Sequence, residues 1–465
     1  MRFQITFICF LLVIIVGCSK HFTNQPLPNQ PPETFLTVLT DSTLRSTTSQ
    51  QHLHWWGVDP DGFIKGYYIS FDSLHWTFTT SNDSVIGLKL NVNDTTYKFF
   101  VAAVDNEGLV DPKPASIRDP IHNSPPVVSF VLQSDVPDTT YPVATFQWIG
   151  TDVDGNETIV NYYYAIDDTS PPTRWKAVVG TSNYITVDSS DGLTEGRHIF
   201  YLKARDIAGA ESKIIRMPID TTKTWYVKKP KGNFLIIDDY GLSDPADVFY
   251  SQIFDTLING NIKAQDVWDI KTGYSGSSRG TYVPALINPT FVRTLKLFKY
   301  IFWYADNDPQ LIIAQAALPE FVKNGGKVLF VTGFPDGTLD LTGIGDFAPI
   351  NNVESNRFGL KLFPADSIVA VDPTYPNLIR DYGSIYTFPR GLLPKVNAKI
   401  IYQMLPSSRW THDSTMIIMG VKDANQANFV MVSAILHRFG GSPPGVPNNV
   451  PAFLRRVFQG EFGVK

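Results

Sequence analysis

One ordered set of landmarks occurs twice between residues 31 and 228, and it constrains the fold of this region more than any other feature. Each copy has an aromatic segment that leads into Asp-x-Asp-Gly, then a Tyr-Tyr pair, a tryptophan and a second aromatic segment. The landmarks lie at 53–62, 67–72, 76 and 99–108 in the first copy, and at 146–155, 162–167, 175 and 200–209 in the second. The shared order indicates a duplicated module of about 100 residues.

Within each copy, apolar and polar residues alternate with the period of a β-strand. Trp55 and Trp148 hold matching positions on the apolar side of these strands, so we expect both in cores. Short strands broken by Gly, Pro, Asn and Asp are typical of a β-sandwich. Both copies resemble fibronectin type III or immunoglobulin-like modules of bacterial surface proteins. We place the modules at 34–123 and 124–228, each entered through a Pro-Pro pair.

The repeated Asp-x-Asp-Gly allows two interpretations. Alternating acids before a glycine resemble the start of a calcium loop, but a glutamate at the twelfth position is missing in both copies. Aspartates also accept backbone N–H groups in turns, and we favour this turn interpretation. The acids concerned are Asp59, Asp61, Asp152 and Asp154.

Three aromatic residues have the opposite phase to the expected core, namely Trp56, Tyr68 and Tyr163. Exposed aromatic rings can stack on sugar rings, so these residues are candidates for a glycan-binding surface. The alternative is that they are isolated surface aromatics, which are common and need no function.

The N-terminal 18 residues have the composition of a signal peptide. Arg2 precedes an apolar run at 5–16, which is short for a membrane span, and the segment ends at Cys18. Small residues before a cysteine resemble a bacterial lipobox, which implies lipidation of Cys18 and an extracytoplasmic protein tethered to a membrane. The next two residues lack aspartate, which favours the outer membrane. The alternative is an ordinary signal peptide in which Cys18 is incidental. Residues 19–33, rich in proline, are expected to form a flexible spacer.

Residues 232–465 are expected to form an α/β domain with a mostly parallel, flavodoxin-like sheet. A short apolar run at 234–237 ends at Asp238 and Asp239, as a strand buried on both faces would. Expected strands at 264–270, 300–304 and 327–333 alternate with expected helices, an order typical of parallel sheets. Residues 338–400 break this alternation and are interpreted as a long insertion that contains Asp366 and Asp372. Later strands at 399–403 and 416–420 are expected to extend the sheet in antiparallel fashion.

The segment 321–329, with its Gly-Gly turn, and the late strand at 428–433 resemble the class I glutamine amidotransferase-like fold. That resemblance implies a nucleophilic cysteine after the Gly-Gly strand. Thr332 stands there instead, and the chain's two cysteines, Cys9 and Cys18, lie in the leader. His412 and His437 have no sequence context that links them to Thr332. We therefore predict no glutaminase activity. We assign no catalytic residue, no metal ligand and no cofactor from the sequence.

Several polar residues follow the expected strands, where open α/β sheets bind ligands. They are Asp238, Asp239, Asp306, Asp308 and Thr332. One hypothesis is an acidic crevice that binds a cation or a polyol, or that hydrolyses a substrate with paired carboxylates. The alternative is that these acids cap the following helices or bind their own loops.

The formal charge of −5, with no basic cluster, argues against a nucleic-acid partner. The first functional hypothesis is a membrane-anchored, non-catalytic binding or scaffolding protein, with a glycan or another envelope polymer as its ligand. The second is a hydrolase of such polymers that uses the strand-end acids. A third is an assembly component whose modules contact an envelope protein.

Overall fold

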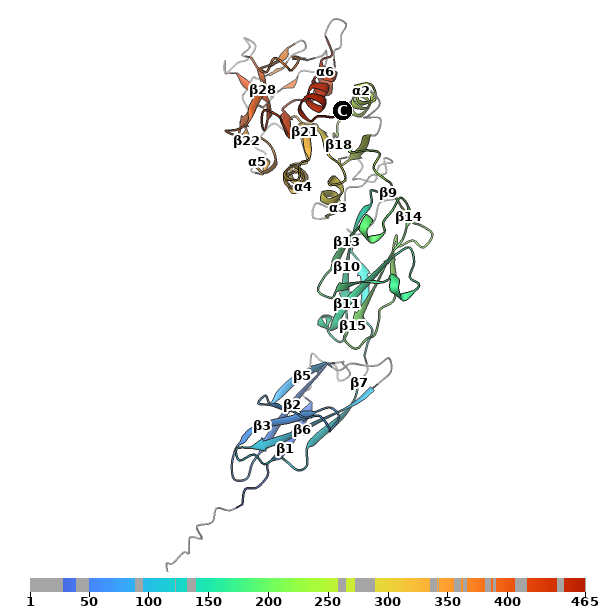
Figure 1. Ribbon diagram of the computed structural model, residues 1–465, viewed down its shortest axis with the longest axis vertical. Coiled ribbons are helices and arrows are strands. Elements are labelled where there is room, and N and C mark those ends of the chain that lie inside the picture. Colours follow the sequence, from blue (N-terminus) through green and yellow to red (C-terminus); the bar gives the residue numbers. More distant parts are fainter. Residues whose placement is uncertain are drawn as a thin grey trace, which may run out of the picture. The chain divides into compact units, whose positions relative to one another are not determined.

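The computed structural model (Figure 1) describes most of the chain after residue 27. The described residues are 28–38, 50–87, 95–121, 123–131, 139–257, 265–271, 289–334, 341, 343–354, 361–362, 366–380, 386–387, 390–405, 416–440 and 447–464. Cys18 and His412 lie outside these ranges. The chain divides into two compact units, one formed by Met1–Pro125, Val153–Thr158 and Ile207–Ala210 and the other by the remaining residues.

The first module is a sandwich of two antiparallel sheets. One sheet has the order β1-β2-β5 and the other the order β4-β3-β6-β7. The strands are β1 (Glu33–Val38), β2 (Gln50–Val58), β3 (Ile64–Ser70), β4 (Thr77–Thr79), β5 (Asp83–Gly87), β6 (Thr95–Asp105) and β7 (Ala115–Ile121). Trp55, Tyr67 and Phe99 lie in the core between the sheets, so the predicted core position of Trp55 is confirmed.

The second module repeats this arrangement with the sheets β13-β10-β8 and β12-β11-β15-β16. Its strands are β8 (Val127–Phe130), β10 (Val143–Thr151), β11 (Ile159–Ile166), β12 (Lys176–Val179), β13 (Tyr184–Asp188), β15 (Phe200–Asp206) and β16 (Ile215–Met217). A third small sheet joins β9 (Thr139–Thr140), β14 (Gly196–His198) and β17 (Trp225–Val227). Trp148 is buried in the core as predicted. Both modules are therefore β-sandwiches of a three-stranded and a four-stranded antiparallel sheet.

The C-terminal region is built on a nine-stranded sheet with the order β19-β18-β20-β21-β30-β29-β28-β24-β25. The strands β19 (Gln265–Asp269), β18 (Phe234–Asp239), β20 (Tyr300–Ala305), β21 (Lys327–Val331) and β30 (Phe429–Val432) are parallel to one another. The strands β29 (Ile417–Lys422), β28 (Lys399–Met404), β24 (Ser367–Ala370) and β25 (Leu378–Ile379) continue the sheet in antiparallel fashion.

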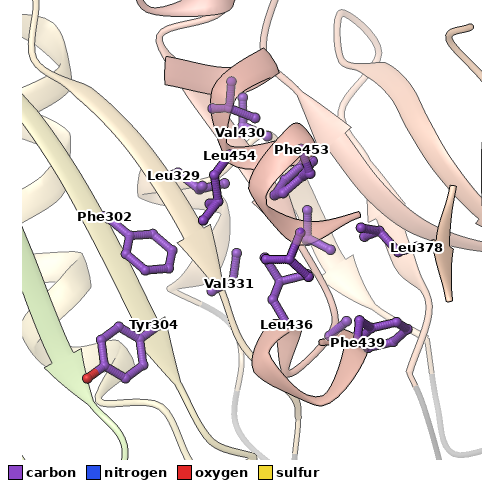
Figure 2. Packing of buried hydrophobic residues seen from close by; sticks show 14 of the residues in the cluster. Phe302, Tyr304, Leu329, Val331, Leu378, Val430, Leu436, Phe439, Phe453 and Leu454 are labelled. Carbon is purple, nitrogen blue, oxygen red and sulfur yellow. The ribbon is translucent and has the colours of Figure 1, made fainter. Parts of the chain in front are cut away.

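Helices cover both faces of this sheet. Side chains of the central strands point alternately to the two faces, and each set packs in a separate core. The core on one face contains residues of α2 (Ala246–Leu257) and α6 (Val450–Arg455), and α6 continues into a π-helical turn at Arg456–Glu461. Figure 2 shows Phe453 and Leu454 of α6 in this core, together with Leu329 and Val331 of β21. The core on the other face contains residues of α3 (Pro289–Leu295), α4 (Leu311–Lys323) and α5 (Ile344–Phe347). None of the described helices is long and apolar enough to cross a membrane.

The expected insertion at 338–400 does more than cover the sheet, because β24 and β25 within it form the far end of the sheet itself. It also contributes two small antiparallel pairs. These are β22 (Ile350–Val353) with β27 (Leu392–Pro394), and β23 (Lys361–Leu362) with β26 (Tyr386–Thr387).

The second module shares a core with the α/β region inside one compact unit. Tyr141 is buried against Trp268 and Phe298, with ring centroids 5.6 and 5.3 Å away. A chain of hydroxyl groups continues this contact, since Thr145 lies 2.8 Å from both Thr186 and Thr290. Exposing this surface would leave large aromatic groups in water, so we infer that the two parts stabilise each other.

Candidate functional site

The predicted strand-end residues meet at one edge of the sheet, because the carboxyl ends of parallel strands coincide. Asp238 and Asp239 end β18, Asp306 follows β20, and Thr332 follows β21. The structure adds Lys271, which follows β19 on the other side of β18 and which sequence analysis did not single out. The signal that could have identified it is its position, two residues beyond a strand that neighbours the Asp-Asp pair.

Asp239 is fully buried. Its Oδ2 accepts hydrogen bonds from Trp303 Nε1 at 3.1 Å and from the backbone N–H of Gln310 at 2.7 Å. Its Oδ1 has no hydrogen-bond partner among the described residues and lies 4.0 Å from Lys271 Nζ. Burial raises the pKa of Asp239 to about 7, against the opposing effects of the Gln310 N–H and the Lys271 ammonium.

Asp306 is the main partner of Lys271, with 2.8 Å between Oδ1 and Nζ. The same Oδ1 accepts the N–H of Asp308 at 2.7 Å, and Oδ2 accepts the N–H of Gly241 at 2.8 Å. Lys271 also donates to the backbone carbonyl of Asp308. Under the hypothesis of an acidic crevice, these acids would bind an external cation. In the structure, the ammonium group of Lys271 is the cation beside Asp306.

The remaining predicted residues have local partners. Asp238 is buried and accepts the N–H of Tyr240 at 3.1 Å. The Asp308 side chain is 73% exposed, and its Oδ2 lies 4.0 Å from Lys271. Thr332 is buried with its hydroxyl 2.9 Å from the carbonyl oxygen of Asp306 and 2.6 Å from that of Gly333, and it donates its proton to one of them. Neither carbonyl is a base that could activate the hydroxyl as a nucleophile.

These contacts limit what the strand-end cluster can do. A carboxylate pair that hydrolyses a polymer must reach its substrate, and Asp239 and Asp306 are 0% and 3% exposed. Within the described ranges, no group of three or more His, Cys, Asp or Glu side chains is arranged to hold a metal ion. The cluster, as observed, joins three strand ends through an internal ion pair.

A second polar cluster lies nearby, and sequence analysis missed its connection. Asp244, just before α2, accepts hydrogen bonds from His437 Nε2 at 2.7 Å, from Arg438 Nε at 3.1 Å and from the Tyr240 hydroxyl. Burial opposes the charged form of Asp244, but these three donors outweigh it and hold its pKa well below the usual value. The partner acid of His437 stands 193 residues earlier in the chain, so no local motif could reveal it.

The second acid of each Asp-x-Asp-Gly segment binds the backbone of the module entry about 30 residues earlier, whereas the prediction placed this contact in the acid's own turn. Asp61 accepts the N–H of Gln30 at 3.1 Å, and Asp154 accepts the N–H of Ser124 at 2.8 Å. Gln30 and Ser124 both directly precede the Pro-Pro pair that enters each module. The duplicated acid therefore fixes the duplicated entry segment.

The three surface aromatics have different environments. Trp56 is 42% exposed and stacks on Phe35, with the ring centroids 5.3 Å apart. Tyr68 is half-buried and contacts Phe78 at 5.5 Å. Tyr163 is half-buried below the ammonium of Lys203, which lies 5.8 Å from its ring centroid.

No protein-family model matches the chain, and no curated protein matches it. Solved structures align with parts of it. The fibronectin(III)-like modules of Clostridium thermocellum CbhA align at 13% identity over 42% of this chain and 95% of theirs, with a TM-score of 0.20. A two-domain fibronectin type III segment of chicken tenascin aligns at 19% identity over 40% of this chain and 97% of its own, with a TM-score of 0.19.

A structure described as carbohydrate-binding modules from the β-sandwich superfamily aligns at 18% identity over 38% of this chain and 60% of its own, with a TM-score of 0.18. TM-scores of this size support no conclusion about the fold or the function of this chain. The assignment of two β-sandwiches therefore rests on the strand pairing described above.

Proposed function

We propose that this protein is a lipid-anchored, extracytoplasmic binding protein of the cell envelope that holds a glycan or another envelope polymer without cleaving it. In this proposal the two sandwiches carry the binding surface. The C-terminal region is a glutamine amidotransferase-like scaffold whose strand-end groups serve stability.

One observation carries the non-catalytic assignment. The acids that could act as a hydrolytic pair, Asp239 and Asp306, are buried and bound to donors of the chain itself. General acid–base catalysis requires a carboxyl group within hydrogen-bonding reach of the substrate. Asp239 and Asp306 are 0% and 3% exposed and are held inside the protein by donors of the chain, so in this proposal neither carboxyl group reaches a polymer in solvent.

The scaffold assignment is supported by strand order. Numbered along the chain, the five parallel strands β19-β18-β20-β21-β30 have the order 2-1-3-4-5, which is the flavodoxin-like order. The position that follows the Gly-Gly strand is Thr332, and the residues 232–465 contain no cysteine. A domain of this kind can keep its fold after the residues for its chemistry are lost.

The anchor rests on the sequence at Cys18. We expect metabolic labelling with palmitate to tag the wild-type protein and to place it in the membrane fraction. The variant Cys18→Ala should lose the label and leave the membrane fraction. Retention of Cys18→Ala in that fraction would contradict the proposed anchor.

The binding role is tested with insoluble cell-envelope polysaccharide. We expect the full chain to co-sediment with this material and to release no new reducing ends. The double variant Asp239→Asn/Asp306→Asn should co-sediment equally well, provided that its circular dichroism spectrum matches the wild type. Release of reducing ends by the wild type but not by the double variant would establish the hydrolase hypothesis instead.

A further inference from the structure

The outer face of the larger sheet differs between the two modules at matched positions. Ala102 on β6 corresponds to Lys203 on β15, since both lie three residues before the buried aspartates Asp105 and Asp206. Val110 and Glu211 form a second matched pair of positions. Each forms an isolated β-bridge with the residue just before the buried aspartate, Val104 in the first module and Arg205 in the second. The first module therefore has two apolar residues where the second has a cation and an anion.

In the second module this ion pair covers the aromatic face. Lys203 Nζ lies 4.8 Å from the ring centroid of Trp175 and 5.8 Å from that of Tyr163, within cation–π range. Its charge is balanced by Glu211, with 2.6 Å between Nζ and Oε2. The aromatic face of the second module thus has an occupant from its own chain.

In the first module the matched positions hold no such pair, and the described part of this face carries four aromatic rings. Tyr68 lies between Phe78 and Ala102 in register across β4, β3 and β6, and Phe100 is two residues before Ala102 on the same face. The fourth ring, Trp76, lies 6.4 Å from Phe100. Phe78 is 44% and Trp76 is 37% exposed. Because rows two residues apart on a strand are separated by about 7 Å, the four rings form one patch.

The rings are held in place without a ligand. Asp72 accepts the N–H groups of Leu74 and His75, both at 2.8 Å, and so fixes the loop that leads to Trp76. Trp76 Nε1 donates to the carbonyl of Ser73 at 3.2 Å. A preorganised surface loses little conformational entropy when it binds, which favours affinity.

The charges around the patch select the kind of occupant. Ala102 and Val110 replace the ion pair, so an incoming cation would find no counter-ion at these positions. Lys98 and Arg118 are exposed, face each other in register and lie on the same side of the sheet as Phe100. These two cations disfavour a cationic partner. The carboxylate of Asp72, in the loop before Trp76, already has a partner in His75, with 2.6 Å between Oδ2 and Nδ1. A neutral ring that presents C–H groups on one face and hydroxyl groups at its edge fits a flat aromatic surface of this kind.

We propose that the outer face of β4, β3 and β6 in the first module binds neutral pyranose glycans, an inference that rests on the proposed binding function. The sugar rings stack on the side chains of Trp76, Phe78, Tyr68 and Phe100. The matched face of the second module does not bind these glycans, because Lys203 occupies it.

The test is native affinity electrophoresis of the full chain in gels that contain hydroxyethyl-cellulose, galactomannan or xylan, with alginate as a charged comparison. We expect at least one of the neutral polysaccharides to retard the wild type. Trp76→Ala and Phe78→Ala should each lower the association constant at least tenfold, whereas Trp175→Ala in the second module should leave it unchanged. Thermal unfolding of each variant verifies its fold.

A gain-of-charge variant tests the same surface without removing a ring. Ala102→Lys/Val110→Glu introduces the ion pair of the second module at the matched positions of the first module, and it should abolish retardation. Because Ala102 is 2% exposed, the result counts only if thermal unfolding of this variant matches that of the wild type. Unchanged retardation in this variant and in both alanine variants would overturn the proposed surface. Retardation by alginate alone would overturn the neutral-ring assignment.

The outcome also separates this inference from the function on which it rests. If the wild type co-sediments with envelope polysaccharide but none of the neutral probes retards it, the ligand class is wrong and the binding role stands. If the wild type shows neither property, both proposals fail.

Discussion

The strand-end cluster of the α/β region and the aromatic face of the first module differ in how far the chain itself covers their side chains. In the cluster, the carboxylates of Asp239 and Asp306 both accept hydrogen bonds from other groups of the chain, and Lys271 supplies the positive charge that pairs with Asp306. On the aromatic face, Trp76 and Phe78 keep more than a third of their surface in water. Polar groups that the fold has already paired have little left for a ligand, whereas an open apolar face gains free energy when it is covered.

The largest expected effect tests whether the cluster is structural. Asp306→Ala removes the acceptor of Lys271 and of two backbone N–H groups, so we expect the free energy of unfolding to fall by about 3–5 kcal/mol, as for other broken buried pairs. Urea denaturation measures the loss. Asp308→Ala is the matched control, because its exposed side chain should change stability by less than about 0.5 kcal/mol. Equal, small effects would mean that the cluster carries no stability.

Asp239→Asn tests the structural role of the cluster through the pH dependence of the free energy of unfolding. The pKa of Asp239 is raised from 3.8 to about 7 in the folded state, so the folded chain holds a proton that the unfolded chain has lost between these values. This group therefore lowers the free energy of unfolding as pH rises from about 4 to 7, and the loss is complete above 7. Asp239→Asn should remove this slope and stabilise the protein at pH 8 by up to a few kcal/mol. Thermal melts at pH 5 and pH 8 measure it, and parallel shifts at both values would contradict the assignment.

Thr332→Val tests whether the hydroxyl serves only the fold. The substitution keeps the shape of the buried side chain but leaves the carbonyls of Asp306 and Gly333 without this donor, so we expect a loss of about 1 kcal/mol in urea denaturation. Binding to envelope polysaccharide should be unchanged. A loss of binding with normal stability would give Thr332 a role that its contacts do not explain.

On the aromatic face the effects on stability should be small. Phe78→Ala removes a ring that is nearly half exposed, so we expect a loss of no more than about 1 kcal/mol. Urea denaturation of this variant and of Trp55→Ala, a fully buried matched control that should lose about 3–5 kcal/mol, gives the contrast. A loss for Phe78→Ala as large as for Trp55→Ala would show that the face is part of the core.

The smallest effect on stability is expected for Lys203→Ala. Its pair with Glu211 lies at the surface, where such pairs contribute about 0.2–1 kcal/mol. The substitution uncovers Trp175 and Tyr163, so collisional quenching of tryptophan fluorescence by acrylamide should increase. Unaltered quenching would show that Lys203 does not cover these rings.

The duplicated sandwiches were predictable because their strands leave a period-two pattern and their turns repeat. The cores around Trp55 and Trp148 follow directly from that pattern. The strand ends at Asp239 and Asp306 were also predictable, since a buried strand must stop where charged residues begin. Lys271 and the pair of Asp244 with His437 were not, because their partners come from distant segments whose proximity is set only when parallel strands assemble.

The amino-acid sequence alone indicated the strands of the two modules and the central strands of the α/β region, because periodicity and turn chemistry act over a few neighbouring residues. It did not indicate β24 and β25, which the insertion adds to the sheet. It also determined that no thiol chemistry is available after residue 18. Only the tertiary structure decided which charged groups neutralise one another and which aromatic rings remain uncovered. Both depend on the distance between side chains and on their burial, and these exist only once the sheets have packed.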